Sequence, residues 1–246
     1  MTHANPLAGM APDRIRGEIN KFRELISGVP YEPKGILYSE MFFFWMLARD
    51  CKPGRILESG RARGQSTLIL SLCFPNCEIV SVEFDEKSPD VAIASERLRD
   101  RANVSLRFGD ATKLLPAIAL SSDVAIIDGP KGYRGLRLAA RLLRSGLPMV
   151  FVHDTSIGSP ERRFLQRRCP EALYSDTVDL ARETHVLDVG ASDNLGQEHR
   201  WQGATPPVAG YGYSLACLPR SPHRSYSGLL AYAVIDGLRY RLRERA

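Results

Sequence analysis

The chain has 246 residues, of which 44% are hydrophobic and 25% are charged, and its formal net charge is +5. These proportions are typical of a globular protein and exclude a disordered chain. The five cysteines include no C-x-x-C pair, so we expect neither a disulfide framework nor a zinc site. No signal peptide is visible, and no apolar run reaches the roughly 20 residues that cross a bilayer. We therefore expect a cytoplasmic protein.

The length predicts one large α/β domain with short additions at both ends. We assign residues 1–50 to an N-terminal helical cap and residues 51–220 to the main domain. Residues 221–246 form a basic C-terminal helix that belongs to the same domain.

Two helices are expected before the main domain. Apolar residues at helical spacing fall within 12–28, and Gly28 and Pro30 end this helix. A second helix is expected over 37–50. Its run of aromatic residues, Phe42 to Trp45, is more typical of a buried core than of a ligand site.

Strands and helices then alternate five times. The strands are expected at 55–58, 78–83, 104–108, 123–128 and 148–153. The helices between them are expected at 65–74, 89–101, 113–120 and 133–145. This alternation predicts a parallel sheet with helices on both faces.

The pattern is weaker after the fifth strand. A helix is expected at 160–168, strands at 185–189 and 213–217, and a loop at 190–212. A terminal helix over 226–243 completes the chain. Because ligands of open parallel sheets bind outside the carboxyl ends of the strands, we examined the residues that follow each strand.

The first strand ends in a glycine-rich turn, Glu58-Ser-Gly60-Arg-Ala-Arg-Gly64, that leads into a helix. Glycine allows a sharp turn and a close approach to a ligand, and the free N–H groups of the helix suit a polar group. The dinucleotide fingerprint G-x-G-x-x-G fails, because Ala62 and Gln65 replace two of its glycines. The turn is either a cofactor site or simply a turn before a helix.

Two acidic residues follow the next two strands. Glu83 lies nineteen positions beyond Gly64, where a carboxylate can accept hydrogen bonds from ribose hydroxyls. A solvated carboxylate at Glu83, or Asp85 as the ligand, is the alternative. Asp110 follows the third strand and either accepts from an adenine amino group or caps the next helix.

These three features, in this order, resemble the class I S-adenosylmethionine (SAM)-dependent methyltransferases over residues 36–218. The resemblance implies a Rossmann-like, doubly wound, mainly parallel sheet of seven strands with an antiparallel last strand. It also implies that the glycine-rich turn holds the methionine part of SAM, Glu83 the ribose and Asp110 the adenine. The cofactor-binding residues expected on this basis are Glu58, Ser59, Gly60, Gly64, Ser66, Glu83, Asp110 and Asp128.

The sequence departs from this pattern at the turn itself. Many members have glycine where this chain has Ala62, and a methyl group there would narrow the pocket. Arg61 and Arg63 are also unusual. Either could meet a carboxylate, but we expect both to face solvent.

The fourth and fifth strands end in Asp128-Gly-Pro-Lys131 and His153-Asp154-Thr155. Neighbouring strand ends would bring the two aspartates together, and oxygen ligands suit Mg²⁺. This pattern resembles the metal-dependent catechol O-methyltransferases, and the His-Asp pair is also similar to macrocin O-methyltransferase-like proteins. The resemblance implies Asp128, Asp154 and Thr155 as metal ligands and Lys131 as the general base. The alternative is that these residues only cap loops.

His153 is a second candidate base, because the ordinary pKa of histidine lies near neutrality.

The resemblance implies a methyltransferase that transfers a methyl group to a hydroxyl of a small molecule such as a sugar, a phenol or a natural product. An inactive binding protein of the same fold is one alternative. An RNA methyltransferase is another, suggested by a pI near 9.0, but no RNA-binding module is visible and nucleic acid is not expected. The terminal helices could form a homodimer surface.

Overall fold

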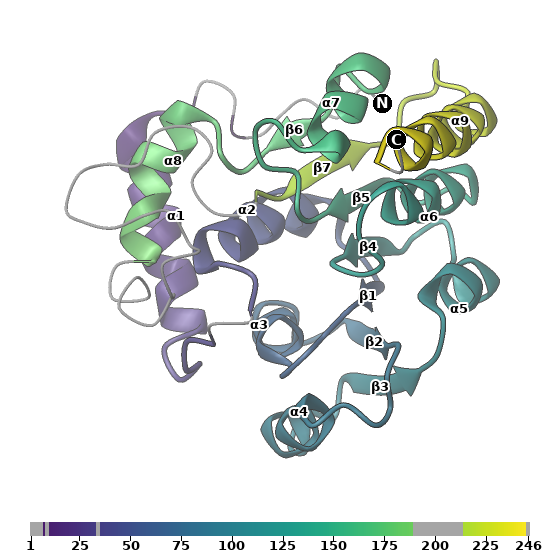
Figure 1. Cartoon of the computed structure of the whole chain (residues 1–246). Helices are drawn as coiled ribbons and strands as arrows, with labels where there is room; N and C mark the ends of the chain where they lie inside the picture. The colour runs from purple at the N-terminus through teal and green to yellow at the C-terminus, as the bar shows by residue number, and fades with distance from the viewer. Residues whose placement is uncertain (1–6, 8–9, 33–34, 189–213, 245–246) are drawn as a thin grey trace.

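The computed structural model describes residues 7, 10–32, 35–188 and 214–244. Seven strands form one sheet in the order β3-β2-β1-β4-β5-β7-β6 (Figure 1). The strands are β1 (Arg55–Ser59), β2 (Glu78–Glu83), β3 (Val104–Phe108), β4 (Val124–Ile127), β5 (Met149–Val152), β6 (Leu173–Tyr174) and β7 (Ala216–Pro219). Strands β1 to β5 pair in parallel, and β7 runs antiparallel to both β5 and β6. The predicted seven-stranded sheet with an antiparallel last strand is confirmed.

The strand order places a topological switch point between β1 and β4. The chain moves outward from β1 to β3 and then returns to β4 on the other side of β1. Loops that leave the carboxyl ends of β1 and β4 therefore turn toward opposite faces, which opens a crevice between them. The crevice is the expected place for a ligand in such a sheet.

Helices cover both faces of the sheet (Figure 1). The helices are α1 (Pro12–Leu25), α2 (Tyr38–Ala48), α3 (Gln65–Cys73), α4 (Asp90–Leu98), α5 (Ala111–Ile118), α6 (Tyr133–Arg144), α7 (Pro160–Arg168), α8 (Val178–Thr184) and α9 (Tyr226–Glu244). Strand residues alternate between two hydrophobic clusters, as Ile56 and Leu57 of β1 show. One cluster holds residues of α1 to α4, and the other holds residues of α5, α6, α7 and α9.

Helix α2 is buried on every side. All residues from Met41 to Ala48 are at most 7% exposed, as expected for a helix that is hydrophobic all round. The rings of Phe43 and Phe44 pack on Phe151 of β5, with centroid distances of 6.1 and 4.5 Å. The prediction that the aromatic cluster belongs to the core is confirmed. The helix lies against the sheet, with its N-terminal turn near the strand ends.

The end of the chain differs from the prediction in two places. The expected strand at 185–189 is wrong, because a 3-10 helix, His185–Leu187, continues α8 and buries Leu187 in the core. The sixth strand is the two-residue β6, which is too short to leave a pattern in the sequence. The expected strand at 213–217 lies later, at β7, and the loop at 190–212 falls outside the described residues.

The terminal helix was predicted correctly and packs mainly on α6. Across the described ranges, no helix has both the length and the apolar character that a membrane crossing requires.

Candidate active site

The turn after β1 depends on two glycines for different reasons. Gly60 has φ +84°, and a Cβ there would lie 2.9 Å from the backbone nitrogen of Gly129, in the loop after β4. Gly64 has φ +77° and begins α3, where a Cβ would lie 3.0 Å from Leu98 of α4. Gly60 therefore permits the loops after β1 and β4 to meet, whereas Gly64 permits two helices to pack.

Ala62 also has a left-handed backbone, with φ +43°. This conformation costs a non-glycine residue roughly 1 kcal/mol. The backbone at position 62 thus favours glycine, the residue that the resemblance in the sequence leads one to expect there.

Glu58 and Ser66, both expected to bind the cofactor, instead bind each other beneath the turn. Glu58 is 1% exposed and accepts hydrogen bonds from Ser66 Oγ and Ser81 Oγ, both at 2.6 Å, and from Thr67 Oγ1 at 2.5 Å. Burial raises the pKa of Glu58, and the three hydroxyls oppose this rise. The hydrogen bond between Glu58 and Ser66 stabilises the turn, and neither side chain lines the cavity at the switch point.

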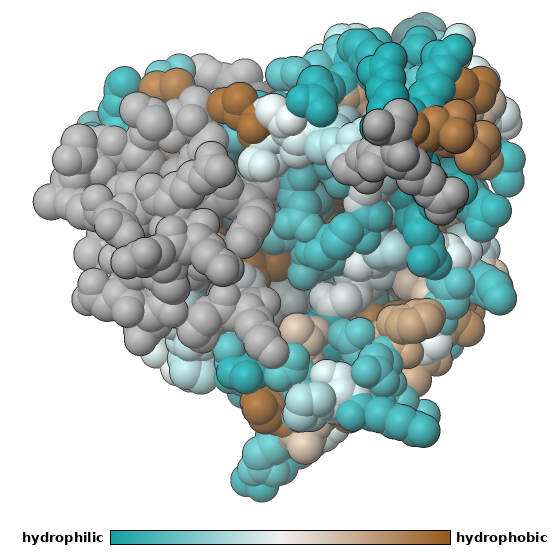
Figure 2. Space-filling model, in the orientation of Figure 1, coloured by the Kyte–Doolittle hydropathy of each residue, from teal (hydrophilic) through white to brown (hydrophobic). Residues whose placement is uncertain are grey.

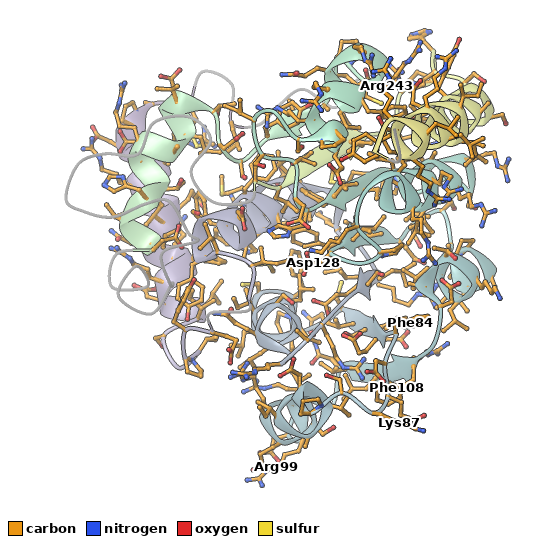
Figure 3. The ribbon with its side chains drawn as sticks, in the orientation of Figure 1. Phe84, Lys87, Arg99, Phe108, Asp128 and Arg243 are labelled. Atoms are coloured by element: carbon orange, nitrogen blue, oxygen red, sulfur yellow. The ribbon has the colours of Figure 1, made fainter. Side chains whose placement is uncertain are left out.

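A cavity of about 250 Å³ opens at the switch point. It is lined by Ser59, Gly60, Val82, Glu83, Phe84, Gly109, Asp110, Ala111, Gly129, Pro130 and Arg134. Figure 3 labels Phe84 just after β2, Phe108 at the end of β3 and Asp128 just after β4. Four of the residues expected to hold the cofactor, Ser59, Gly60, Glu83 and Asp110, thus line one crevice, and Gly64 lies outside its lining.

Glu83 is held by the glycine-rich turn. Its Oε2 accepts from the backbone N–H groups of Arg61 and Ala62 at 3.2 and 3.1 Å, and its Oε1 accepts from Phe84 at 2.7 Å. A carboxylate has about four lone-pair sites, so roughly one remains for a ribose hydroxyl. The side chain orients the turn and still faces the cavity.

Asp110 performs the capping role that was the alternative to adenine binding. Its Oδ1 accepts from the Thr112 N–H at 2.9 Å and from Thr112 Oγ1 at 2.7 Å, which caps α5. Its Oδ2 lies 3.8 Å from Arg134, at the cavity wall. The hydrogen bonds from Thr112 lower the pKa of Asp110. One carboxylate oxygen therefore caps the helix and the other remains at the cavity.

The two aspartates after β4 and β5 meet as predicted. His153 Nδ1 lies 2.7 Å from Asp128 Oδ1 and 3.2 Å from Asp154 Oδ1. Lys131 Nζ lies 2.5 Å from Asp128 Oδ1 and 2.6 Å from Asp154 Oδ2. Four predicted residues thus form one charged group directly beside the Gly129 wall of the cavity.

One further member of this group, Glu40 of α2, was not predicted from the sequence. Its Oε2 lies 3.1 Å from His153 Nε2 and also accepts from the backbone N–H of Leu37 at 3.0 Å. Glu40 is 2% exposed. The sequence carried one signal for Glu40, a single carboxylate at the start of an otherwise apolar helix. A buried carboxylate requires a partner, so this residue could have been expected to meet a charged or polar group.

The charged side chains of this group shift one another's pKa values. Burial lowers the pKa of His153, but the attraction of Asp128 and Glu40 outweighs it, and the pKa rises well above the usual 6.5. The pKa of Lys131 is raised, because its two aspartates overcome burial. The pKa of Asp154 falls to about 2: burial would raise it, but His153 and Lys131 outweigh that effect. The neighbouring carboxylates therefore favour the protonated, cationic form of both predicted bases.

The same residues bear on the predicted metal site. Ligand atoms of Asp128, His153 and Asp154 lie within 4.8 Å of one another. However, the Lys131 ammonium lies between the two aspartates, where a metal cation would bind. The Thr155 hydroxyl donates to the Ser214 carbonyl at 3.1 Å, so this predicted ligand is directed elsewhere. A metal fits here only if Lys131 moves away.

The expectation that Arg61 faces solvent is wrong. Arg61 is 3% exposed, donates to the carbonyls of Ser81 and Arg107 and stacks on Phe108 at 4.6 Å. Arg63 meets carboxylates, as the alternative allowed, and bridges Glu32 and Asp90 at 3.0 and 2.8 Å. Both arginines stabilise the turn.

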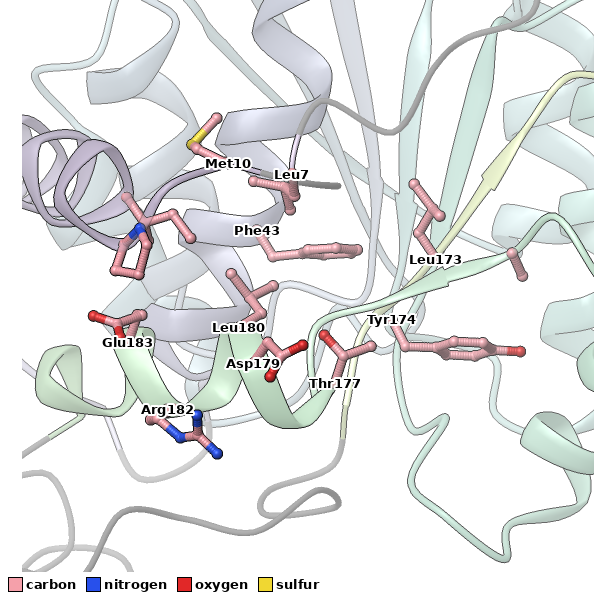
Figure 4. Close-up of a pocket in the computed structure, with 13 residues that line it drawn as sticks. Leu7, Met10, Phe43, Leu173, Tyr174, Thr177, Asp179, Leu180, Arg182 and Glu183 are labelled. Atoms are coloured by element: carbon pink, nitrogen blue, oxygen red, sulfur yellow. The ribbon is translucent and has the colours of Figure 1, made fainter.

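A larger cavity of about 540 Å³ lies away from this site, between α1, α8 and β6. Figure 4 shows the Phe43 ring in its middle, with Leu180 and Leu173 nearby and Asp179 and Glu183 on α8. None of the predicted site residues lines it. The crevice at the switch point is therefore the candidate active site.

No protein-family model matches the sequence. Among solved structures, a SAM-dependent O-methyltransferase from Thermotoga maritima aligns with a TM-score of 0.53 and 12% identity, over 83% of this chain and 72% of that chain. Cofactor-bound Rv0187 from MTB aligns with a TM-score of 0.52 and 19% identity, over 87% and 93%. An O-methyltransferase from Bacillus cereus in complex with SAH gives 0.50 and 17%, over 82% and 90%. The chain has the methyltransferase fold. At such identities the likeness extends to the fold, and the case for activity depends on the residues of the site.

Proposed function

We propose that this protein is a SAM-dependent methyltransferase that methylates a hydroxyl group of a small molecule. The observation that supports this proposal best is the juxtaposition at the switch point. A cavity formed by the Gly60, Glu83 and Asp110 loops lies directly beside the charged group of Asp128, Lys131, His153 and Asp154.

The residues of the cavity fit the parts of SAM. The Gly60 turn would hold the methionine part, the remaining lone-pair site of Glu83 the ribose, and Asp110 Oδ2 the adenine amino group. The exposed ring of Phe84 at the cavity wall offers an apolar surface for the adenine. When bound, SAM supplies a methyl group on a positively charged sulfur. The chain must align that methyl group with the acceptor oxygen, and alignment alone can contribute several kcal/mol to the rate.

The acceptor hydroxyl would lie against Asp128 and Asp154. The neighbouring carboxylates raise the pKa of both Lys131 and His153, which favours their protonated forms and makes either a poor proton acceptor. The hydroxyl proton becomes strongly acidic as the new C–O bond forms, and a carboxylate of low pKa can then accept it. We therefore propose one of the two aspartates as the proton acceptor, in place of the Lys131 or His153 base expected from the sequence.

Lys131 and His153 would then orient the aspartates. Lys131 bridges the two carboxylates, and His153 connects Asp128 to Glu40 of α2. This arrangement leaves the carboxylates ionised and fixed, as a preorganised site requires.

Magnesium-assisted transfer is a second candidate, supported by the clustering of Asp128, His153 and Asp154. It would require the Lys131 ammonium to leave the two carboxylates. Lys131→Ala should then raise Mg²⁺ affinity, which calorimetry with MgCl₂ would measure. Unchanged or absent binding in this variant would contradict the magnesium proposal.

The proposed function is tested by calorimetry with SAM and by transfer of labelled methyl groups to a panel of phenols and sugars. We expect SAM to bind to the wild type and Glu83→Ala to weaken this binding by about tenfold, the effect of roughly one charge-assisted hydrogen bond. Glu86→Ala, which changes a nearby exposed carboxylate, is the control. Failure of the wild type to bind SAM would refute the proposal, and binding without transfer to any acceptor would favour the inactive binding protein.

A further inference from the structure

Helix α9 has two apolar faces, and among the described parts of the chain a packing partner covers one of them. Its inner face packs on α6 and buries Leu229 and Ala233. On its outer face Ile235, Leu238 and Leu242 are 43%, 55% and 69% exposed. Their spacing of three and four residues places them on one side of the helix. Figure 2 shows brown residues among teal ones in this part of the surface, at the upper right.

Arginines flank this apolar stripe on both sides. Arg239 and Arg243 are four residues apart and share one flank, on the side of α7, near which Figure 3 labels Arg243. Arg241 lies on the other flank, toward Arg137 and Arg141 of α6, whose charges interact with one another. Arginines therefore border the stripe on both sides, although Arg239 also pairs with Asp236 of the same helix at 3.6 Å.

The positive charges on the α6 side reinforce one another. Burial lowers the pKa of Arg137, and the like charges of Arg241, Arg134 and Arg141 lower it further. Arg137 and Arg141 donate hydrogen bonds to the carbonyl groups of Tyr133 and Thr112, which leave their charge unchanged. Such a concentration of charge costs free energy unless an anionic partner is present.

We infer that the outer face of α9 docks on a membrane surface that contains anionic lipids. The apolar stripe would enter the boundary between headgroups and acyl chains, and the flanking arginines would bind the headgroup phosphates. An exposed apolar stripe bordered by arginines is the pattern of helices that lie in the interface plane.

The apolar stripe and the flanking arginines disfavour two other partners for this face, a second copy of the chain and a polynucleotide. A second copy of the chain, the homodimer considered from the sequence, would bring the arginines on the flanks of the two stripes close together. A polynucleotide would neutralise the arginines but would leave Leu238 and Leu242 without an apolar partner. Of these three occupants, a lipid surface with anionic headgroups is the one that matches both the apolar stripe and the arginines.

The test is flotation of the purified full chain with vesicles of phosphatidylcholine and phosphatidylserine, and with vesicles of phosphatidylcholine alone. We expect binding to the anionic vesicles that decreases with added salt. The double variant Leu238→Gln/Leu242→Gln should bind about tenfold more weakly, because two apolar anchors are lost. Leu120→Gln changes a leucine of similar exposure, 57%, on a different element and should bind as the wild type does.

Thermal melting of all variants tests whether they fold. Arg241→Gln removes one flanking charge, so it should reduce only the salt-dependent part of vesicle binding. The proposal is wrong if the wild type fails to float with the anionic vesicles, or if the double variant floats as well as the wild type. A concentration-dependent dimer that the double variant abolishes would also overturn it. So would salt-sensitive binding to polyuridylic acid without any binding to vesicles.

Discussion

The two halves of the candidate site are built by different means. The proposed cofactor half, at the ends of β1, β2 and β3, is formed by backbone: Gly60 permits contact with the loop after β4, and backbone N–H groups hold Glu83. The proposed acceptor half, at the ends of β4 and β5, is formed by charged side chains that neutralise one another. The first half depends on local conformation, and the second depends on groups that are far apart in the sequence.

This difference predicts how each half responds to substitution. A change in the backbone half should affect cofactor affinity and local strain. A change in the charged half should leave an unpaired charge near the core and thereby affect both folding and catalysis. The following variants test that contrast, from the largest expected effect to the smallest.

Asp128→Ala should have the largest effect. It leaves the His153 and Lys131 cations with one carboxylate fewer, and removal of one partner from a buried ionic group costs about 3 kcal/mol of stability. Methyl transfer should fall by at least about 100-fold if an aspartate accepts the proton. Urea denaturation and the methyl-transfer assay measure the two effects. Asp100→Ala, at a carboxylate that is 84% exposed, is the control and should change neither. Normal turnover by Asp128→Ala would exclude Asp128 as the proton acceptor, and the same loss in Asp154→Ala would then assign the role to Asp154.

Gly60→Ala tests the backbone half. The added Cβ would lie 2.9 Å from the nitrogen of Gly129, and φ is +84°, so we expect a loss of about 2 kcal/mol in stability. SAM affinity should fall by at least about tenfold, because the loops after β1 and β4 would separate. Calorimetry measures the affinity. Gly54→Ala is the matched control, because a Cβ there meets nothing within 4 Å. Equal SAM affinity in the two variants would show that the close approach is not needed.

His153→Gln should change the pH dependence of stability. The pKa of His153 is raised in the folded protein, so its contribution is fully present below the unfolded value, about 6.5, and is lost as the pH rises through the folded value. The free energy of unfolding of the wild type should therefore exceed that of the variant most at acidic pH. Urea denaturation over a pH series measures this difference. A difference that grows with rising pH would contradict a protonated His153, and His223→Gln, at an exposed histidine, is the control.

Ala62→Gly should have the smallest effect. It relieves a left-handed alanine with φ +43°, but glycine increases the entropy of the unfolded chain. These opposing changes leave a stabilisation of about 0.5 kcal/mol. Thermal melting measures it, and SAM affinity should remain within about twofold if the Ala62 methyl group does not narrow the cavity. A clear gain in affinity would support the narrowing expected from the sequence.

The sequence alone determined the alternation of strands and helices from β1 to β5, because hydrophobic periodicity and turn-forming residues are properties of short segments of the chain. It failed at the strand expected over 185–189, because His185–Leu187 continue helix α8 and Leu187 packs into the core. It could not find β6, a two-residue strand that exists only because β7 lies beside it.

The sequence likewise identified Asp128, Lys131, His153 and Asp154, because each follows the end of a strand. It could not determine their protonation, since the pKa values of His153 and Lys131 depend on which charges lie within a few ångströms. Glu40 is more than one hundred positions from His153 and reaches it only because α2 packs on β5. Burial and long-range electrostatics are properties of the folded chain, so only the tertiary structure decided which of the predicted residues cooperate and in which charge state.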